Sequence, residues 1–191
     1  MIRTVTRRAS LVALMLAVAW TSAGVLAQAP RKVDASKSFI RFVTRQMNVP
    51  VEGRFTTFEA TVAFESKKPE ATRAEFEVEL ASIDMGSLEG EFETQRPLWF
   101  NTQAFPRAKF VASSVRALGP GRFEASGALT IKGITRTITT PFTLTESGGQ
   151  RTVEGRFTLK RLQFRIGEKQ WSDTETVADD VDVHYRFVLP A

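Results

Sequence analysis

Few side chains in this chain are suited to catalysis. Its 191 residues contain no cysteine and a single histidine, His184. A Ser–His–Asp triad would have to be built on that histidine, and the sequence has no G-x-S-x-G nucleophile elbow. Period-two alternation also places His184 on the outward face of a strand, between Val183 and Tyr185. We therefore expect no catalytic residue and no enzymatic activity.

Metal ligands are equally scarce. Zinc sites need several histidine or cysteine ligands, which this sequence lacks. Asp179, Asp180 and Asp182 form an acidic cluster, but the glycine and the terminal glutamate of a calcium loop are missing. We expect these carboxylates to be solvated at the start of a strand, and we expect no metal and no cofactor other than a bound lipid or quinone.

Apolar and polar residues alternate with a period of two through most of the chain. In residues 74–80 every even position is apolar, and the odd positions are Glu75, Glu77 and Glu79. On a strand these carboxylates share one face, so one face is wet and the other dry. The same alternation, separated by turn sequences, predicts further strands joined as hairpins. With the strand at 74–80, the expected strands lie at 39–44, 58–64, 108–116, 123–131, 134–146, 153–159 and 181–189.

These eight strands predict an all-β fold, an extended antiparallel eight-stranded barrel with one short helix. Closure removes the edges of a sheet, and eight strands enclose room for one small ligand. The helix is expected within residues 87–100, capped by Ser87 and ended or kinked at Pro97. The hexapeptide Val-Glu-Gly-Arg-Phe-Thr occurs twice, and we interpret Gly53 and Gly155 in it as positions for a bend or a close backbone approach.

The first residues predict a secretory signal peptide at 1–27. Three arginines precede an apolar run at 11–20, which is shorter than the roughly 18 to 20 residues needed to span a bilayer. We expect cleavage after Ala27 and export to the periplasm, by the Sec or the twin-arginine route. Residues 28–191 then form a single domain. Without the three arginines the chain has 23 basic against 21 acidic residues, so nucleic acid is not an expected partner.

The interior of the barrel is expected to be rich in phenylalanine, which occurs fifteen times and mostly at apolar strand positions. A membrane-spanning barrel would instead turn its apolar face to lipid, so we expect no stable membrane insertion. The interior is either a filled core or an apolar cavity, and periodicity leaves both open. The residues expected to line an apolar pore are Phe42, Phe58, Phe64, Phe76, Val78, Leu80, Trp99, Phe100, Phe110, Phe123, Leu129, Phe142, Phe157 and Phe164.

Seven short segments follow one another in a recognisable order. They are FIRF at 39–42, GRF at 53–55, LASID at 80–84, WFN at 99–101, FPRAKF at 105–110, GALTIKGITR at 127–136 and FRIG at 164–167. With them, the chain from Ser38 to its end resembles the YceI-like family, periplasmic lipocalin-like barrels known for binding polyisoprenoids. The resemblance implies an eight-stranded barrel with a helix over one part and an isoprenoid chain, such as a quinone tail, threaded through an apolar pore.

The chain departs from that family at one place. Many members carry a histidine after the first strand, where this sequence reads Arg45-Gln46-Met47-Asn48. If that histidine meets the polar head of the ligand, Arg45 or Gln46 is left to donate to a carbonyl or hydroxyl; alternatively, the segment is an exposed turn. The segment Trp99-Phe100 is expected to close or line one end of the pore.

The resulting hypothesis is a noncatalytic periplasmic binding or carrier protein for a long-chain isoprenoid lipid such as a quinone. The alternative is a ligand-free packed barrel that acts as a stress or protein-interaction module. An enzyme acting on a lipid is the weakest reading, because the acid and base groups are outward or absent. The sequence predicts no oligomeric state.

Overall fold

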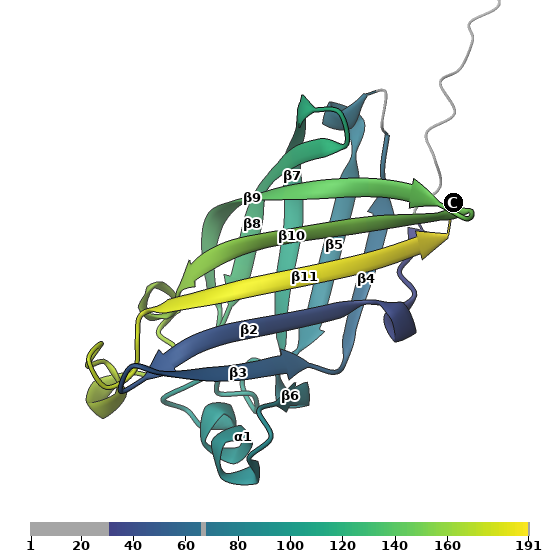
Figure 1. Ribbon diagram of the computed structural model, residues 1–191. Coiled ribbons are helices and arrows are strands. Elements are labelled where there is room, and N and C mark those ends of the chain that lie inside the picture. Colours follow the sequence, from purple (N-terminus) through teal and green to yellow (C-terminus); the bar gives the residue numbers. More distant parts are fainter. Residues whose placement is uncertain (1–30, 66–67, 191) are drawn as a thin grey trace, which may run out of the picture.

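The computed structural model describes residues 31–65 and 68–190 (Figure 1). It confirms an all-β fold with one α-helix, α1 (Leu88–Gln95). All strands belong to one antiparallel sheet with the order β1-β4-β5-β7-β8-β9-β10-β11-β2-β3-β6. The strands are β1 (Arg31–Lys32), β2 (Phe39–Gln46), β3 (Val49–Phe55), β4 (Phe58–Ala63), β5 (Arg73–Glu79), β6 (Ile83–Asp84), β7 (Arg107–Gly119), β8 (Arg122–Ile131), β9 (Ile134–Ser147), β10 (Gln150–Lys160) and β11 (Asp180–Pro190).

The number of strands is eleven rather than the predicted eight. β1 and β6 have two residues each, too few for an alternating pattern to reveal. β3 is the third strand that the predicted eight did not include. It ends before β4 because the chain bends at Thr56 and Thr57, whose backbones bond to Ser82 and Glu79 instead of continuing the sheet. The sheet curls on itself, but its order ends at β1 and β6, so closure is incomplete.

The curled sheet forms two layers, here called its two faces, and the strands of one layer run across those of the other (Figure 1). β10, β11, β2 and β3 run across the front, whereas β4, β5, β7 and β8 run behind them, with α1 at one end. The two halves are joined by β9 on one side, and β11 pairs with β2 so that Tyr185 faces Ile40. The last strand therefore pairs with the first long strand, and the space between the two faces lies inside the curl.

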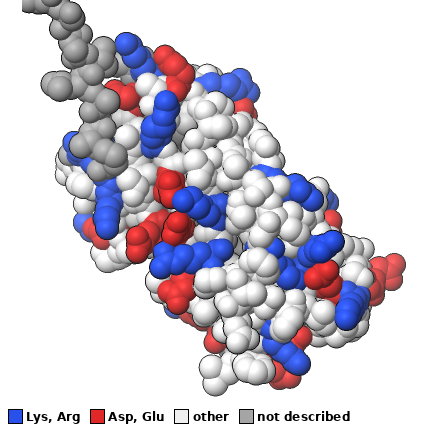
Figure 2. All heavy atoms as spheres, turned by 180° about the vertical axis from the view of Figure 1, so that it is seen from behind, with Lys and Arg blue, Asp and Glu red and all other residues white. Residues whose placement is uncertain are grey.

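Alternation sets the two sides of β5 as predicted. On β5, Glu77 turns outward, and its carboxylate accepts a hydrogen bond from Arg107 on β7 at 2.8 Å. That hydrogen bond lowers the pKa of Glu77, outweighing the opposing effect of desolvation. Glu75 pairs with Lys109 in the same row. Figure 2 shows the same interspersed charges of both signs on the back of the molecule, which is typical of a solvated outer face.

The repeated hexapeptide serves close approach rather than bending. Gly53 on β3 lies opposite Phe42 on β2, and a Cβ at this position would come within 2.3 Å of the Phe42 ring. Gly155 on β10 faces Tyr185 in the same way. Each glycine thus leaves room for an inward aromatic ring from the neighbouring strand.

The predicted helix begins and ends where the sequence indicates. The Ser87 hydroxyl accepts a hydrogen bond from the Gly90 amide at 3.3 Å, and Pro97 follows directly after the capping residue Arg96. Within 31–65 and 68–190, no helix is both long and apolar enough to cross a membrane. The predicted signal peptide and its cleavage after Ala27 lie outside the described residues.

Candidate functional site: an apolar cavity

A cavity of about 570 Å³ lies between the two faces of the curled sheet. This volume is within the range of about 300 to 1,000 Å³ that is typical of small-molecule sites. Its lining is mostly aromatic and aliphatic and comes from nearly every long strand. Of the two interiors that the sequence left open, a filled core and a cavity, the structure has the cavity.

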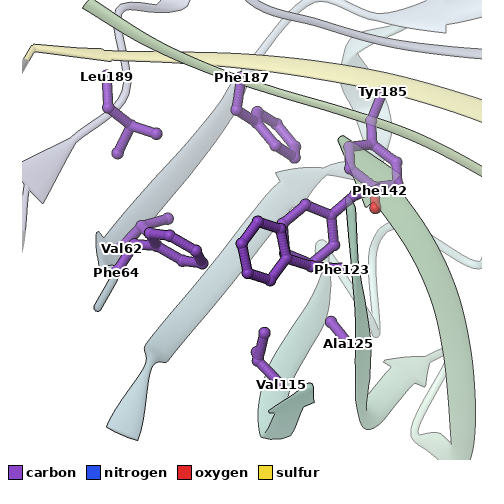
Figure 3. Packing of buried hydrophobic residues seen from close by; sticks show 9 residues of the cluster. All are labelled: Val62, Phe64, Val115, Phe123, Ala125, Phe142, Tyr185, Phe187 and Leu189. Carbon is purple, nitrogen blue, oxygen red and sulfur yellow. The ribbon is translucent and has the colours of Figure 1, made fainter. Parts of the chain in front are cut away.

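Aromatic rings gather in one apolar cluster that borders the cavity, here called its aromatic end (Figure 3). Phe64 meets Phe123 edge to face with ring centroids 5.2 Å apart, and Phe123 stacks on Phe142 at 5.4 Å. Tyr185 stacks on Phe187 at 5.4 Å. Such ring pairs stabilise the cluster beyond the burial of their area.

Most of the predicted pore residues face the cavity. Phe58, Phe123 and Phe164 are not part of its lining; they pack in the apolar clusters around it. Alternation shows that a side chain points inward, but it does not show whether that side chain meets free space or another side chain. Contact of these residues with a ligand stays a prediction. The eleven that line the cavity are Phe42, Phe64, Phe76, Val78, Leu80, Trp99, Phe100, Phe110, Leu129, Phe142 and Phe157.

The cavity also contains polar groups that the sequence reasoning missed. The Tyr185 and Thr140 hydroxyls lie 3.0 Å apart in the lining. Burial raises the pKa of Tyr185 to about 12, only partly offset by the hydrogen bond with Thr140. The alternation of 181–189 placed Tyr185 inward, so the signal was present. The phenol therefore stays neutral and can act as a hydrogen-bond donor or acceptor.

Arg161 lies buried beside the cavity with 1 % of its surface exposed. Its five N–H groups donate to five backbone carbonyls in the segment 166–178. Burial lowers the pKa of the guanidinium. Because every donor is already used, Arg161 holds this segment in place rather than offering a hydrogen bond to a ligand. Alternation gives no signal for such a residue.

Trp99 and Phe100 follow α1 in the chain and are part of the cavity lining. The Trp99 ring lies 5.5 Å from the Trp171 ring, and the Arg161 guanidinium lies 5.8 Å from the Trp99 ring centroid. The amide of Gly167 also donates to the Leu98 carbonyl at 2.8 Å. Trp99 and Phe100 are thus held between α1 and the segment 166–178, which Arg161 holds in place.

One end of the cavity, here called its mouth, is bordered by α1 and by the end of β2. From α1, Glu89, Gly90, Glu93 and Thr94 face the cavity. From the end of β2, Gln46 is part of the lining, whereas Arg45 is not and donates to the Asn48 carbonyl at 3.2 Å. Both side chains are exposed. Of the two donors considered in place of the family histidine, Gln46 is therefore the one at the cavity.

His184 lies on the outer face, as predicted, and is not part of the cavity lining. Its Nε2 is 2.8 Å from a Glu154 oxygen, and Arg186 donates to the other oxygen of Glu154 at 2.9 Å. Although burial alone would raise the pKa of Glu154, these two partners hold it below its usual value. The outer-face position separates the single histidine from the cavity.

The three aspartates have structural partners at the start of β11. Asp179 accepts a hydrogen bond from the Leu162 amide at 2.9 Å, Asp180 pairs with Lys160, and Asp182 accepts from the Thr158 hydroxyl at 2.7 Å. In the described part of the chain, no three acidic or histidine side chains converge as a metal site would require. Their bonds account for the cluster seen in the sequence.

Comparison with known proteins identifies relatives of this chain. Protein YceI of Escherichia coli O157:H7 is 27% identical over 167 residues, which cover 82% of this chain and 87% of that protein. A UPF0312 protein of Pseudomonas savastanoi is 28% identical over 142 residues, 73% of this chain and 74% of the relative.

Solved structures share the fold. The crystal structure of Burkholderia cenocepacia BcnA matches with a TM-score of 0.80 and 36% identity over 82% of this chain and 98% of that one. A domain from Saccharophagus degradans, described as polyisoprenoid-binding, matches with a TM-score of 0.68 and 15% identity over 86% of this chain and 99% of that one. The model of the YceI-like domain matches residues 32–189, nearly the whole described chain. The chain therefore belongs to the YceI-like family.

Proposed function

We propose that this protein binds a long-chain isoprenoid lipid, such as a prenyl quinone, in the cavity between its two sheet faces. The observation that carries the proposal is the cavity of about 570 Å³ with its almost wholly apolar lining. Burial of apolar surface stabilises a complex by roughly 25 cal/mol per Å². A long hydrocarbon chain supplies such surface without needing many hydrogen bonds.

The shape of the lining favours a long ligand over a compact one. Lining residues run from Phe142 and Phe187 at the aromatic end, past Phe76 and Val78 in the middle, to Gln46 at the mouth. The Tyr185 and Thr140 hydroxyls in the lining bond to each other, whereas Gln46 at the mouth can donate to a carbonyl or hydroxyl. We therefore place the chain of the ligand along the cavity and its head group toward α1.

The family relationship supports the same class of ligand. A solved domain of this fold, from Saccharophagus degradans, is described as polyisoprenoid-binding. Because that domain is only 15% identical to this chain, the comparison shows the shared fold alone. The choice of ligand therefore rests on the cavity of this chain. The rival function, a ligand-free packed barrel serving protein interaction, has the cavity volume against it.

We further propose that the protein acts by binding and not by catalysis, and that it works in the periplasm. The single histidine lies on the outer face, away from the cavity. Export rests on the sequence of residues 1–27. The intact mass of protein from a periplasmic fraction is expected to correspond to a chain that begins at Gln28. A mass that retains Met1 would overturn the proposed export.

The ligand itself is tested by extracting purified protein with organic solvent and analysing the extract by mass spectrometry. We expect the extract to contain a prenyl lipid in a near-stoichiometric amount to the protein. This lipid should be enriched relative to an extract of the membranes of the same cells. A folded protein whose extract contains no prenyl lipid would contradict the proposal. Turnover of the lipid by the protein would contradict the noncatalytic role.

A further inference from the structure

Four large apolar side chains project into water around the mouth of the cavity. Met47 lies in the β2–β3 turn and Val49 begins β3, and they are 71% and 62% exposed. Leu88 and Phe92 belong to α1 and are 85% and 70% exposed. The other exposed large hydrophobic residues of the described chain are at most 40% exposed. We call these four residues the mouth rim. Exposed large apolar residues on two elements at the same end of the cavity are typical of an interaction site.

The apolar and polar sides of α1 are oriented opposite to those of a typical surface helix. A helix on a globular protein normally turns its apolar stripe to the core. Here Glu93 and Thr94 face the cavity, whereas Leu88 and Phe92, one helical turn apart, face solvent. Burial in this chain does not explain the apolar face of α1, so an external apolar surface is its natural partner.

The turn holds its apolar side chains out on a fixed support. Met47 and Asn48 both have positive φ, 51° and 66°, as in the tight turns that join hairpin strands. The Met47 amide donates to the Thr176 carbonyl at 2.9 Å, and Gln46 forms a bridge with Val177. A bulky residue rarely adopts a positive φ. Because the hydrogen bond to Thr176 and the bridge to Val177 fix the turn, Met47 is held in its exposed position.

We propose that the mouth rim docks on the surface of a lipid bilayer, where the protein takes up or delivers its ligand. This inference rests on the proposed function, because the rim adjoins the cavity mouth through Gln46, Glu89 and Glu93. A lipid that is insoluble in water must pass between membrane and cavity without crossing free solvent. A rim that enters the headgroup region gives that path a continuous apolar wall.

The charges near the rim have both signs, since Glu175 is exposed beside Thr176, whose carbonyl accepts from the Met47 amide. Arg45 beside the turn, and Lys169 in the short helix that ends at Trp171, form no ion pair among the residues the structure describes. On α1, Glu93 is already paired with Arg96 at 3.0 Å, and the Glu91 carboxylate accepts from the Met85 amide. Glu89 stays exposed at the cavity side of the helix. The two unpaired cations can contact phosphate while the rim inserts.

The test is flotation of ligand-free protein with vesicles of phosphatidylethanolamine and phosphatidylglycerol. The double variant Leu88→Ser/Phe92→Ser is expected to lower vesicle binding at least about tenfold, because two apolar side chains lose their burial. Met47→Ser/Val49→Ser tests the turn independently and should do the same. The control is Leu118→Ser, which removes an exposed leucine near the far end of β7 and should leave flotation unchanged.

The outcomes separate docking from ligand binding. Flotation of both rim variants at the wild-type level would overturn the docking proposal, as would a wild-type dimer in sedimentation that the rim variants dissociate and that does not float. The rim variants should still bind a prenyl quinone supplied in detergent. Wild-type protein that floats but binds no prenyl quinone in detergent would instead refute the proposed function.

Discussion

Tyr185 lies directly opposite Gly155 on the neighbouring strands β11 and β10, and its ring fills the space that a side chain at Gly155 would need. A Cβ at Gly155 would come within 2.3 Å of the Tyr185 hydroxyl and 2.6 Å of the Pro141 carbonyl oxygen. Gly53 receives the Phe42 ring in the same manner. The two copies of the hexapeptide thus shape the front wall of the cavity.

Gly155→Ala is expected to destabilise the protein by about 1 to 3 kcal/mol, the usual cost of overpacking. The Tyr185 ring must move, and one of its neighbours is backbone that cannot easily give way. Urea unfolding measures the change. Arg156→Ala, on the exposed face of the same strand, is the control and should stay within about 0.5 kcal/mol of wild type. An unchanged free energy of unfolding for Gly155→Ala would contradict this packing.

Tyr185 is the only tyrosine of the chain, so its ionisation can be followed by ultraviolet absorbance of the phenolate. The folded protein is expected to titrate with a pKa of about 12, against 10.0 for an ordinary tyrosine. A raised folded pKa means that the stability contribution is full below pH 10 and is lost as the pH rises toward 12. Phenolate appearing near pH 10 while the protein is still folded would show that Tyr185 is not buried.

His184→Ala is expected to leave lipid binding unchanged, because the imidazole lies on the outer face. Its hydrogen bond with Glu154 on that partly exposed face makes the loss of stability small, within about 1 kcal/mol. The sequence alone predicted about 0.5 kcal/mol, the range for a surface position without special contacts. Thermal melting and lipid titration measure the two effects. Loss of any lipid-converting activity on this single change would favour an enzyme instead.

Trp99→Ala is expected to weaken lipid retention more than it lowers stability. Trp99 is half-buried and borders the cavity, so part of its contacts are available to a ligand. Phe164→Ala is the contrasting variant, since Phe164 is 1% exposed and lies off the cavity. It should cost about 3 to 5 kcal/mol of stability while its folded molecules keep the lipid. If Trp99→Ala behaves in that second way, Trp99 is a core residue only.

The sequence predicts those features that depend on local pattern. Alternation placed Glu77 outward and Val78 inward, and the Ser87 cap marked the start of α1. Features that depend on distant segments escaped it. Arg161 is explained only by carbonyls of residues up to seventeen positions away, such as Val177 and Ala178.

Two-residue strands and free volume are equally hidden from a periodic pattern. β1 is fixed by its pairing with Val62 and Thr61 on β4, not by alternation of its own. Phe58 and Phe76 both alternate inward, yet only Phe76 meets the cavity. Both rings pack against Phe187, with ring centroids 6.0 Å away for Phe58 and 4.5 Å away for Phe76. Which of them also borders free space is decided by the whole curl of the sheet, which the alternation does not encode.

Val78→Trp is expected to keep or raise the stability of the ligand-free protein, because Val78, near the end of β5, borders free space. In a filled interior the same change would cost about 1 to 3 kcal/mol through overpacking. Glu77→Gln, next to it on the outer face, is the control that leaves the interior untouched. Melting temperatures must be compared after delipidation, since a bound ligand raises apparent stability by mass action.

The most direct test of lipid binding in the cavity is a titration of delipidated Val78→Trp protein with a long-chain prenyl quinone, beside wild type and Glu77→Gln. Wild type and Glu77→Gln are expected to bind with equal affinity and saturate at one quinone per chain. The indole of Val78→Trp occupies space that the ligand needs, so its affinity is expected to fall at least about tenfold, a loss of roughly 1.4 kcal/mol. Folded Val78→Trp protein that binds the quinone as tightly as wild type would contradict binding in this cavity.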